Sequence, residues 1–273
     1  MKSKIIINDY STYSPKRRDS LENSPVRYLL DKHYLENKTK IENKLNRFIS
    51  LKEQLCEISR DFNKDRPQAP NWINGWLPGA DALSLYGYAA LGNPRHYVEV
   101  GSGNSTKFVR QAIKDHDLQT RIISIDPCPR AEIDAICDEV VRAPLEELDT
   151  GFFSMLQEGD VFFIDNSHRS FQNSDVTVFF TEILPTLRAG ITIGIHDIYL
   201  PFDYPNEWAD RFYNEQYLLC CYLLGGMNRL EIELPLVYLY YCTESMQLLN
   251  DLWADERMKG VEKHGAAFWL RTT

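Results

Sequence analysis

The chain has 273 residues, with 30 Lys and Arg against 39 Asp and Glu and a formal net charge of −9. A hydrophobic fraction of 44% and an aromatic fraction of 12% can fill a core, which excludes a globally disordered chain. The negative charge argues against nucleic-acid binding over the whole surface, because such binding needs dense lysine and arginine to replace counterions. The apolar runs are far shorter than the roughly 20 residues that span a bilayer. With no secretory-type apolar run at the N-terminus and six cysteines without CxxC spacing, we expect a cytoplasmic protein that does not bind membranes and keeps reduced thiols.

Residues 1–80 are expected to form an N-terminal helical arm. Its first half, 1–40, is polar and has few periodic apolar positions, which predicts an arm or a partly ordered extension. Residues 41–62 place apolar side chains at steps of three, four or seven, which predicts an amphipathic helix with one narrow apolar stripe. The stripe would pack on the main domain or on a second copy of the chain, so a homodimer through this helix is an open alternative.

The main domain is expected over residues 81–273, where predicted strands and helices alternate. Predicted strands lie at 96–101, 121–126, 139–143, 160–165, 190–197, 230–241 and 266–271. Predicted helices lie at 81–92, 105–116, 129–138, 145–156, 174–187, 214–225 and 244–256. Alternation of this kind indicates an α/β fold with a doubly wound, mostly parallel sheet, and the last two strands are candidates for an antiparallel edge. Ligands of such sheets gather at the carboxyl ends of the strands.

A glycine-rich turn follows the first predicted strand of the main domain. It reads Glu99-Val100-Gly101-Ser102-Gly103, and the next helix offers unpaired N–H groups and a positive dipole end. A GxG between strand and helix favours a nucleotide-like ligand. The third glycine of the dinucleotide fingerprint is replaced by Thr106, which argues against an NAD-dependent dehydrogenase.

Asp126 ends the second predicted strand, 23 residues beyond Gly103. A carboxylate in this place can accept both hydroxyls of a ribose. The alternative is a helix N-cap for the predicted helix at 129–138. With the glycine turn upstream, we favour ribose binding.

Four motifs in order, VEVGSGNST, IISIDP, DVFFIDNSH and ITIGIHDI, resemble the class I S-adenosylmethionine-dependent methyltransferases. The chain is similar in particular to the bacterial subgroup with a D-x-S-H motif after the fourth strand, and the resemblance covers roughly residues 80–271. It implies a Rossmann-like seven-stranded sheet with an antiparallel last strand. It also implies that the cofactor is held by Glu99, Gly101, Ser102, Gly103, Asp126 and Asp165.

Two acids and two histidines, Asp165, His168, His196 and Asp197, follow the fourth and fifth predicted strands. Three uses compete. A histidine can be the general base that removes a hydroxyl proton, with His168 preferred, His196 second and Asp165 part of the same catalytic group. Asp165, Asp197 and His168 can instead hold a divalent metal. The third use is structural, as turn caps and backbone hydrogen bonds.

An aromatic segment, 199–217, follows the fifth predicted strand and is expected to shape an acceptor pocket. Arg169 and Arg211 are candidates to hold an anionic acceptor, although a surface role is the ordinary explanation for arginine. The leading hypothesis is a methyltransferase that acts on a hydroxyl of a small molecule, a sugar or a natural-product intermediate. The alternatives are a metal-dependent hydroxylase or hydrolase on the same fold, and a non-catalytic cofactor-binding protein.

Overall fold

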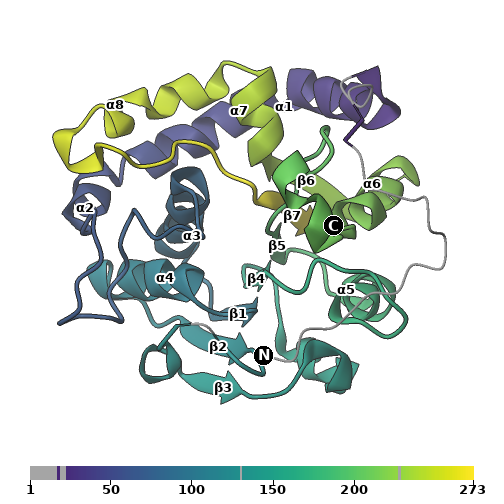
Figure 1. Cartoon of the computed structure of the whole chain (residues 1–273), viewed down its shortest axis with the longest axis horizontal. Coiled ribbons are helices and arrows are strands. Elements are labelled where there is room, and N and C mark those ends of the chain that lie inside the picture. The colour runs from purple at the N-terminus through teal and green to yellow at the C-terminus, as the bar shows by residue number, and fades with distance from the viewer. Residues whose placement is uncertain (1–16, 19–22, 130, 227–228) are drawn as a thin grey trace.

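A computed structural model describes residues 17–18, 23–129, 131–226 and 229–273 (Figure 1). These residues form a seven-stranded sheet with the strand order β3-β2-β1-β4-β5-β7-β6. The strands are β1 His96–Val100, β2 Arg121–Ile125, β3 Glu139–Val141, β4 Val161–Ile164, β5 Thr192–Ile195, β6 Leu230–Pro235 and β7 Phe268–Thr272. The helices are α1 Pro25–Ile49, α2 Lys52–Glu57, α3 Gly79–Gly92, α4 Asn104–Asp115, α5 Asp175–Val178, α6 Glu215–Leu224, α7 Leu236–Cys242 and α8 Asn250–Trp253.

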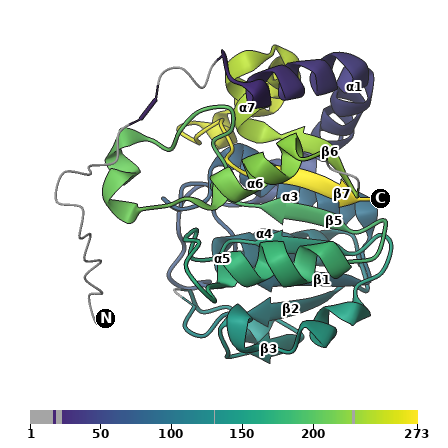
Figure 2. The same ribbon diagram turned by 90° about the vertical axis from the view of Figure 1, so that its right-hand side faces the viewer.

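The sheet is Rossmann-like, as the sequence predicts. Strands β1 to β5 pair in parallel, and β7 runs antiparallel between β5 and β6. Helices α3 and α4 cover one face, and α5 and α6 cover the other (Figures 1 and 2). The chain goes outward from β1 to β3 and then returns to β4 on the other side of β1, so the strand order reverses between β1 and β4. Ligand sites of open parallel sheets form at such a reversal.

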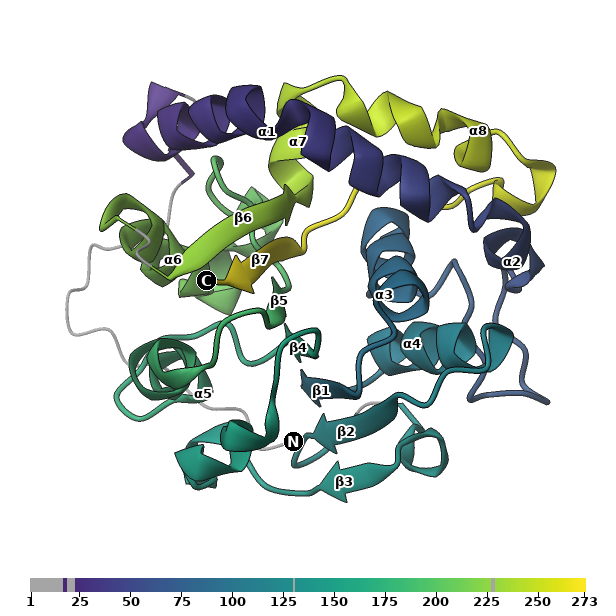
Figure 3. The same cartoon turned by 180° about the vertical axis from the view of Figure 1, so that it is seen from behind.

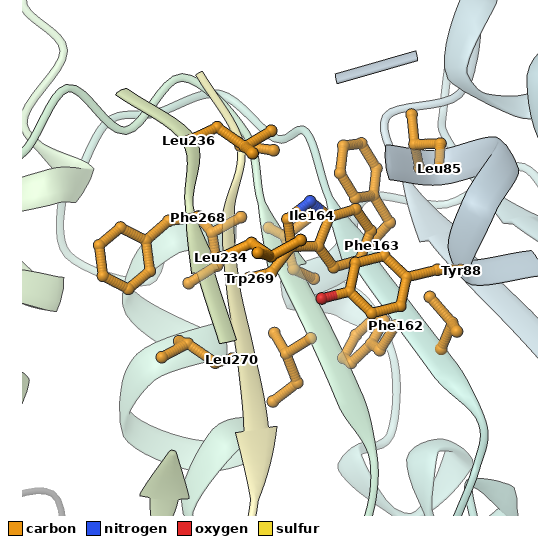
Figure 4. Close-up of a cluster of buried hydrophobic side chains, with 14 of the residues drawn as sticks. Leu85, Tyr88, Phe162, Phe163, Ile164, Leu234, Leu236, Phe268, Trp269 and Leu270 are labelled. Carbon is orange, nitrogen blue, oxygen red and sulfur yellow. The ribbon is translucent and has the colours of Figure 1, made fainter. Parts of the chain in front are cut away.

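The core is centred on strands that are buried on both faces. All residues of β4 and β5 are buried, which explains their continuous apolar sequence. Trp269 on β7 lies among Phe163 of β4 and Tyr88 of α3, with ring centroids 5.6 and 4.2 Å away (Figure 4). Its indole N–H donates to Ser84 Oγ at 2.9 Å, so the one polar atom of the ring has a partner.

The first helix begins much earlier than the sequence pattern predicts. Helix α1 starts at Pro25, with Ser24 as its N-cap, whereas the pattern indicates a helix only from residue 41. Val26 and Leu30 in its first half are buried, and i,i+4 ion pairs such as Arg27–Asp31 support the exposed side. The expected arm at 1–40 is therefore helical from residue 25. Residues 1–16 and 19–22 lie outside the described ranges.

The apolar stripe of α1 packs on its own chain. Helix α1 contacts α3, α6 and β6, and it crosses one end of the molecule beside α7 (Figure 3). At the crossing with α3, a Cβ on Gly87 would lie 2.4 Å from the Phe48 ring, so the two helices approach closely because glycine has no side chain. Of the two uses expected for the stripe, the structure shows packing on the main domain.

Several predicted elements are shorter or different. The predicted strand at 230–241 ends at Pro235, which has no N–H to donate to a sheet, and helix α7 follows. Tyr238 on that helix donates to Asp31 of α1 at 2.8 Å, a tertiary contact that overrides its strand preference. The helices predicted at 129–138 and 145–156 are short 3₁₀ turns. None of the helices within the described ranges has the length and apolar character needed to cross a membrane.

Candidate functional site

A pocket of about 600 Å³ opens at the carboxyl ends of β1, β2, β4 and β5. Its floor is at the β1–β4 reversal of the sheet, where the fold predicts a ligand site. Most residues singled out from the sequence line it. They are Gly101, Ser102, Gly103, Asp126, Asp165, His168, His196, Asp197 and Arg211.

The glycine turn after β1 requires glycine at its first position. Gly101 has a φ of +78°, and a Cβ there would lie 1.7 Å from the carbonyl oxygen of Asp165. The backbones after β1 and β4 therefore touch at this point. Gly103 differs: a Cβ built on it meets nothing within 4 Å, although the residue lines the pocket. The backbone at 101–103 thus leaves open space for a ligand.

Asp126 is fixed beside this turn by the backbone. Its Oδ2 accepts from the Ser102 N–H at 3.0 Å, and its Oδ1 accepts from the Cys128 N–H at 2.7 Å. Each carboxylate oxygen has a further lone pair, so the half-buried side chain can accept from two neighbouring hydroxyls. The N-cap alternative is not what the structure shows, because residues 129–138 contain only the 3₁₀ turn Asp134–Ile136 in their described part.

Glu99 is placed behind the pocket. It is fully buried, is not among the lining residues, and accepts hydrogen bonds from Tyr97 and Thr106. Burial raises the pKa of Glu99 to about 7, against the opposing effect of its hydroxyl donors. Thr106 Oγ1 in turn accepts from the Gly103 N–H at 3.0 Å. Glu99 thus supports the glycine turn through Thr106.

The side of the pocket after β3 is formed by Pro144, Leu145 and Glu146. Arg142, just before them, is used elsewhere: it donates to the Asp126 carbonyl at 2.8 Å and pairs with Asp134. The apolar side chains of Pro144 and Leu145, with Glu146 beside them, suit the edge of a flat heterocycle.

His168 lies in the pocket wall with a fixed ring. Its Nδ1 is 2.8 Å from Glu215 Oε2, and its Nε2 is 3.2 Å from Asp165 Oδ1 and 3.5 Å from Asp197 Oδ2. Glu215, the first residue of α6, is fully buried and also accepts from the Asn166 amide at 3.0 Å. Glu215 carries no distinguishing signal in the sequence, since an acid in the first turn of a helix is commonplace.

His196 occupies the matching place after β5. Its Nε2 is 3.2 Å from Asp81 Oδ2, and its buried Nδ1 faces Asp165 and Asp197 at 3.3 and 3.5 Å without a well-aligned hydrogen bond. Asp81, on α3, also accepts from the N–H groups of Ala266 and Ala267. The sequence signal for Asp81 is an acid on a helix that is otherwise apolar and buried, and Asp81 is not among the site residues predicted from the sequence.

Two residues of this group have strained backbones. His168 has a φ of +57° and Asp197 a φ of +53°, in the left-handed region that side chains other than glycine rarely adopt. Such strain persists only where surrounding structure holds it, and it clusters at functional sites. Here the turn at His168 is held by its N–H, which donates to Asn166 Oδ1 at 2.8 Å, and by its carbonyl, which accepts from Asn214.

The ionisable groups of the site shift one another's pKa values. Burial alone would lower the pKa of His168, but Asp165, Glu215 and Asp197 outweigh burial and raise it well above its usual value. The pKa of His196 is raised in the same way, by Asp165 and Asp197 against burial. The two histidines in turn hold the pKa of Asp165 below its usual range despite burial. Both imidazoles are therefore charged at neutral pH in this structure.

The metal hypothesis finds no arrangement to support it in the part of the chain that the structure describes. No group of three or more His, Cys, Asp or Glu side chains there is disposed to hold a metal ion. Asp165, Asp197 and His168 instead form the ion-pair contacts described above.

Aromatic rings of the 199–217 segment form the remaining wall. Trp208 and Tyr213 line the pocket, with ring centroids 5.7 Å apart, and the Tyr213 ring lies 4.7 Å from the ring of His168. The two tryptophans that precede α3 differ in burial. Trp72 is buried against Phe108, whereas Trp76 is 63% exposed and lines the pocket.

Comparisons with known proteins agree with this geometry at the level of the domain. Residues 98–198 match the model of the methyltransferase domain family. No curated protein matches the sequence closely enough to count as a relative.

Solved structures give weaker likenesses. The SAH-bound methyltransferase PaMTH1 of Podospora anserina is 13% identical, with 99% of each chain covered and a TM-score of 0.43. The O-methyltransferase of Bacillus cereus in complex with SAH is 14% identical, with 85% of this chain and 90% of that one covered and a TM-score of 0.42. The O-methyltransferase TomG of Streptomyces achromogenes, in complex with SAM, is 15% identical, with 81% and 89% covered and a TM-score of 0.41.

These TM-scores and identities are too low to transfer a substrate or a catalytic residue. The family match covers the chain from β1 to just beyond β5, and with it the glycine turn, Asp126, Asp165, His168 and the histidine–aspartate pair after β5. Residues 98–198 are thus similar to a methyltransferase domain, and the strand ends that line the pocket lie inside the matched range.

Proposed function

We propose that the protein transfers a methyl group from S-adenosylmethionine to a hydroxyl of a small molecule. The observation that carries the proposal is the backbone cradle at 101–103. Gly101 cannot hold a side chain, Gly103 leaves open space, and the carboxylate of Asp126 is fixed beside both. Within a methyltransferase domain, this combination suits an amino-acid moiety at the turn and a ribose at Asp126.

The residues present fit this cofactor. Ser102 and Gly103 would lie under its amino-acid part, Asp126 would accept its ribose hydroxyls, and Pro144, Leu145 and Glu146 would border its adenine. Glu99 would act indirectly, because it holds Thr106 and through it the Gly103 N–H. When bound, S-adenosylmethionine supplies a methyl group on a positively charged sulfur. Asp165, which lines the pocket and is held ionised by two histidines, suits that positive charge.

His168 is the proton acceptor in this proposal. The hydrogen bond to Glu215 fixes its ring, and Nε2, which faces Asp165 and Asp197, is the atom that would exchange a proton with an acceptor hydroxyl. The ring is charged at neutral pH, so it must lose its extra proton before it can act as a base. His196, held by Asp81, and Asp165 complete the same group. The Tyr213 and Trp208 rings exclude water from the reacting atoms.

The D-x-S-H subgroup, the class of acceptor and the homodimer remain proposals. The order Asp165-Asn166-Ser167-His168 supports the D-x-S-H subgroup, and the aromatic wall is compatible with a sugar or a natural-product intermediate as acceptor. A homodimer through α1 remains a prediction, with the stripe of that helix already packed on its own chain. A metal-dependent activity is not favoured, and no specific contact supports a cofactor-binding protein without catalysis.

Calorimetry with S-adenosylhomocysteine tests the proposal through Gly103→Ala. The new methyl group enters open space in the free protein, so the thermal midpoint should hardly change. It would overlap a cofactor at the turn, and affinity should fall roughly 10- to 100-fold, as for an overpacked contact. Gly92→Ala, a glycine of α3 in ordinary contact and outside this pocket, is the matched control. Absence of binding to the wild type, or equal affinity in Gly103→Ala, would overturn the proposal.

A further inference from the structure

Arg211 brings a positive charge into a pocket that is otherwise rich in acids. Among the described residues that line the pocket, it is the single lysine or arginine, whereas five lining residues are acidic: Asp126, Glu146, Asp165, Asp175 and Asp197. Arg211 ends the 3₁₀ turn Asn206–Arg211. Its guanidinium lies over the Trp208 ring, 4.3 Å from the centroid, which holds the long side chain against the pocket wall.

A second guanidinium lies against the same wall. Arg169 is over the Tyr213 ring at 5.3 Å, and Arg211 is near the same ring at 5.6 Å. The Arg169 Nε donates to the carbonyl oxygen of Arg211 at 2.7 Å, so one arginine fixes the backbone of the other. Two like charges gathered on one aromatic ring repel each other unless an anion lies near them.

Neither arginine has an acidic partner in the described part of the chain, where their contacts are rings and carbonyl oxygens. Asp203, in the same 199–217 segment as Arg211, shows the ordinary case in which an arginine and a carboxylate are paired. That buried carboxylate is paired with Arg18 at 3.1 Å. Asp203 of this segment thus has an arginine partner, whereas Arg211 at the pocket and its neighbour Arg169 have no acidic partner among the described residues.

The position of Arg211 relative to His168 indicates what the two arginines would bind. The centroid of the Tyr213 ring lies 4.7 Å from that of the His168 ring and 5.6 Å from the Arg211 guanidinium, so Tyr213 is a shared neighbour of both groups. An acceptor that places its hydroxyl at His168 could have its far end at Arg211, because both residues line the same pocket. Elsewhere in the pocket the charged imidazoles of His168 and His196 already face Asp165 and Asp197, and the remaining acids would repel a negative group.

We propose that the methyl acceptor carries an oxyanion, a carboxylate or a phosphate, which Arg211 binds, with Arg169 as the positioning residue that fixes Arg211. The inference rests on the proposed function, since it assigns the substrate class of the same site. A guanidinium binds either oxyanion in a fork-like manner, so both groups share this chemistry. The rings of Trp208 and Tyr213 would contact the apolar body between the anion and the hydroxyl.

Binding of three matched probes to the protein loaded with S-adenosylhomocysteine tests the inference. Benzoate carries a carboxylate, phenyl phosphate carries a phosphate, and benzamide is the neutral analogue. Calorimetry gives the affinities, and quenching of tryptophan fluorescence reports binding at Trp208. We expect at least one anion to bind about 10- to 100-fold more tightly than benzamide, the range of a charge-assisted hydrogen bond. The two anionic probes distinguish a carboxylate from a phosphate acceptor.

Arg211→Gln should abolish this preference for an anion. Arg188→Gln, which removes the same charge from an exposed position before β5, should retain it. The inference is overturned if benzamide binds as well as the anions, if neither anion binds at millimolar concentration, or if Arg211→Gln leaves the preference intact. It is also overturned if Arg211→Gln loses S-adenosylhomocysteine, because Arg211 then serves the cofactor. A wild type that does not bind S-adenosylhomocysteine removes the proposed function and this inference together.

Discussion

The two sides of the pocket differ in what forms them: one is mainly backbone, and the other is mainly side chains. The side after β1 and β2 is made of backbone: a turn with a left-handed glycine, an open glycine and one carboxylate fixed by two N–H groups. The side after β4 and β5 is made of side chains, with two buried histidines, their carboxylate partners and an aromatic wall. The first side can recognise a constant ligand. Substitutions on the second side can change the specificity of the pocket without disturbing the glycine turn.

The same contrast appears in how each side is held. The glycine turn is held in part by contacts close in sequence, those of Thr106 with Gly103 and Glu99, and in part by Asp126, which is 24 residues from Ser102. The histidines are held by residues far along the chain: Glu215 lies 47 residues from His168, and Asp81 lies 115 residues from His196. Substitutions on the first side should therefore affect cofactor binding, and substitutions on the second side should affect turnover.

The largest effect is expected from Gly101→Ala. A Cβ would lie 1.7 Å from the Asp165 carbonyl, at a φ of +78°. Overpacking and backbone strain together should cost about 2–5 kcal/mol of folding free energy, and S-adenosylhomocysteine binding should be lost. Thermal denaturation and calorimetry measure both quantities, with Gly92→Ala as the control. A variant with wild-type stability and affinity would contradict the contact between the two turns.

His168→Gln tests whether the two sides of the pocket have separate roles. Glutamine can still donate to Glu215, so the buried carboxylate keeps a partner, but it cannot accept a proton as a base. We expect kcat to fall about 10²- to 10⁴-fold with the affinity for S-adenosylhomocysteine nearly unchanged. The readouts are methyl transfer from labelled cofactor and calorimetry. If cofactor affinity falls in parallel with kcat, His168 belongs to the cofactor side and the contrast fails.

Glu215→Gln should move the pH dependence of turnover. His168 must be neutral to accept a proton, and its pKa is raised above 6.5 by Asp165, Glu215 and Asp197 against burial, so kcat should rise with pH above that value. Removal of the Glu215 charge lowers that pKa, and the rising limb should shift to lower pH. The profile of kcat against pH for both proteins checks this. An unshifted limb would assign the titration to another group.

The folding stability that the ion pairs of His168 provide should fall as pH rises, whereas kcat should increase. Because the folded-state pKa of His168 lies above the unfolded value, the contribution is complete below about pH 6.5. It is lost as pH rises through the folded-state value. Urea unfolding of the wild type across this window should show a decrease, and the decrease should be smaller in Glu215→Gln.

The smallest effect is expected from Arg18→Ala. Arg18 pairs with Asp203 in the aromatic segment, but its side chain is 57% exposed, so the pair should contribute at most about 1 kcal/mol. Turnover and cofactor affinity should be unchanged, and KM for the acceptor should rise a few-fold at most. A loss of cofactor binding in this variant would show that the two sides of the pocket are coupled through the arm.

Local sequence was sufficient to predict the side of the pocket after β1 and β2. The spacing of Gly101, Gly103 and Asp126 predicts their meeting at one sheet edge, because the carboxyl ends of neighbouring parallel strands are brought together by any such sheet. The same rule brings Asp165 and His196 together. It does not tell which histidine nitrogen faces which carboxylate, and it does not indicate that Glu99 is turned away from the pocket.

The sequence by itself determined the alternation of strands and helices, the parallel sheet and the residues at its carboxyl edge, because these depend on periodicity and on short-range turn chemistry. Only the tertiary structure decided that α1 begins at Pro25, that residues 236–242 form a helix, and that Glu215 and Asp81 are the partners of the two histidines. Each of these features depends on contacts between segments distant in sequence. Their energies come from burial and pairing that no local pattern contains.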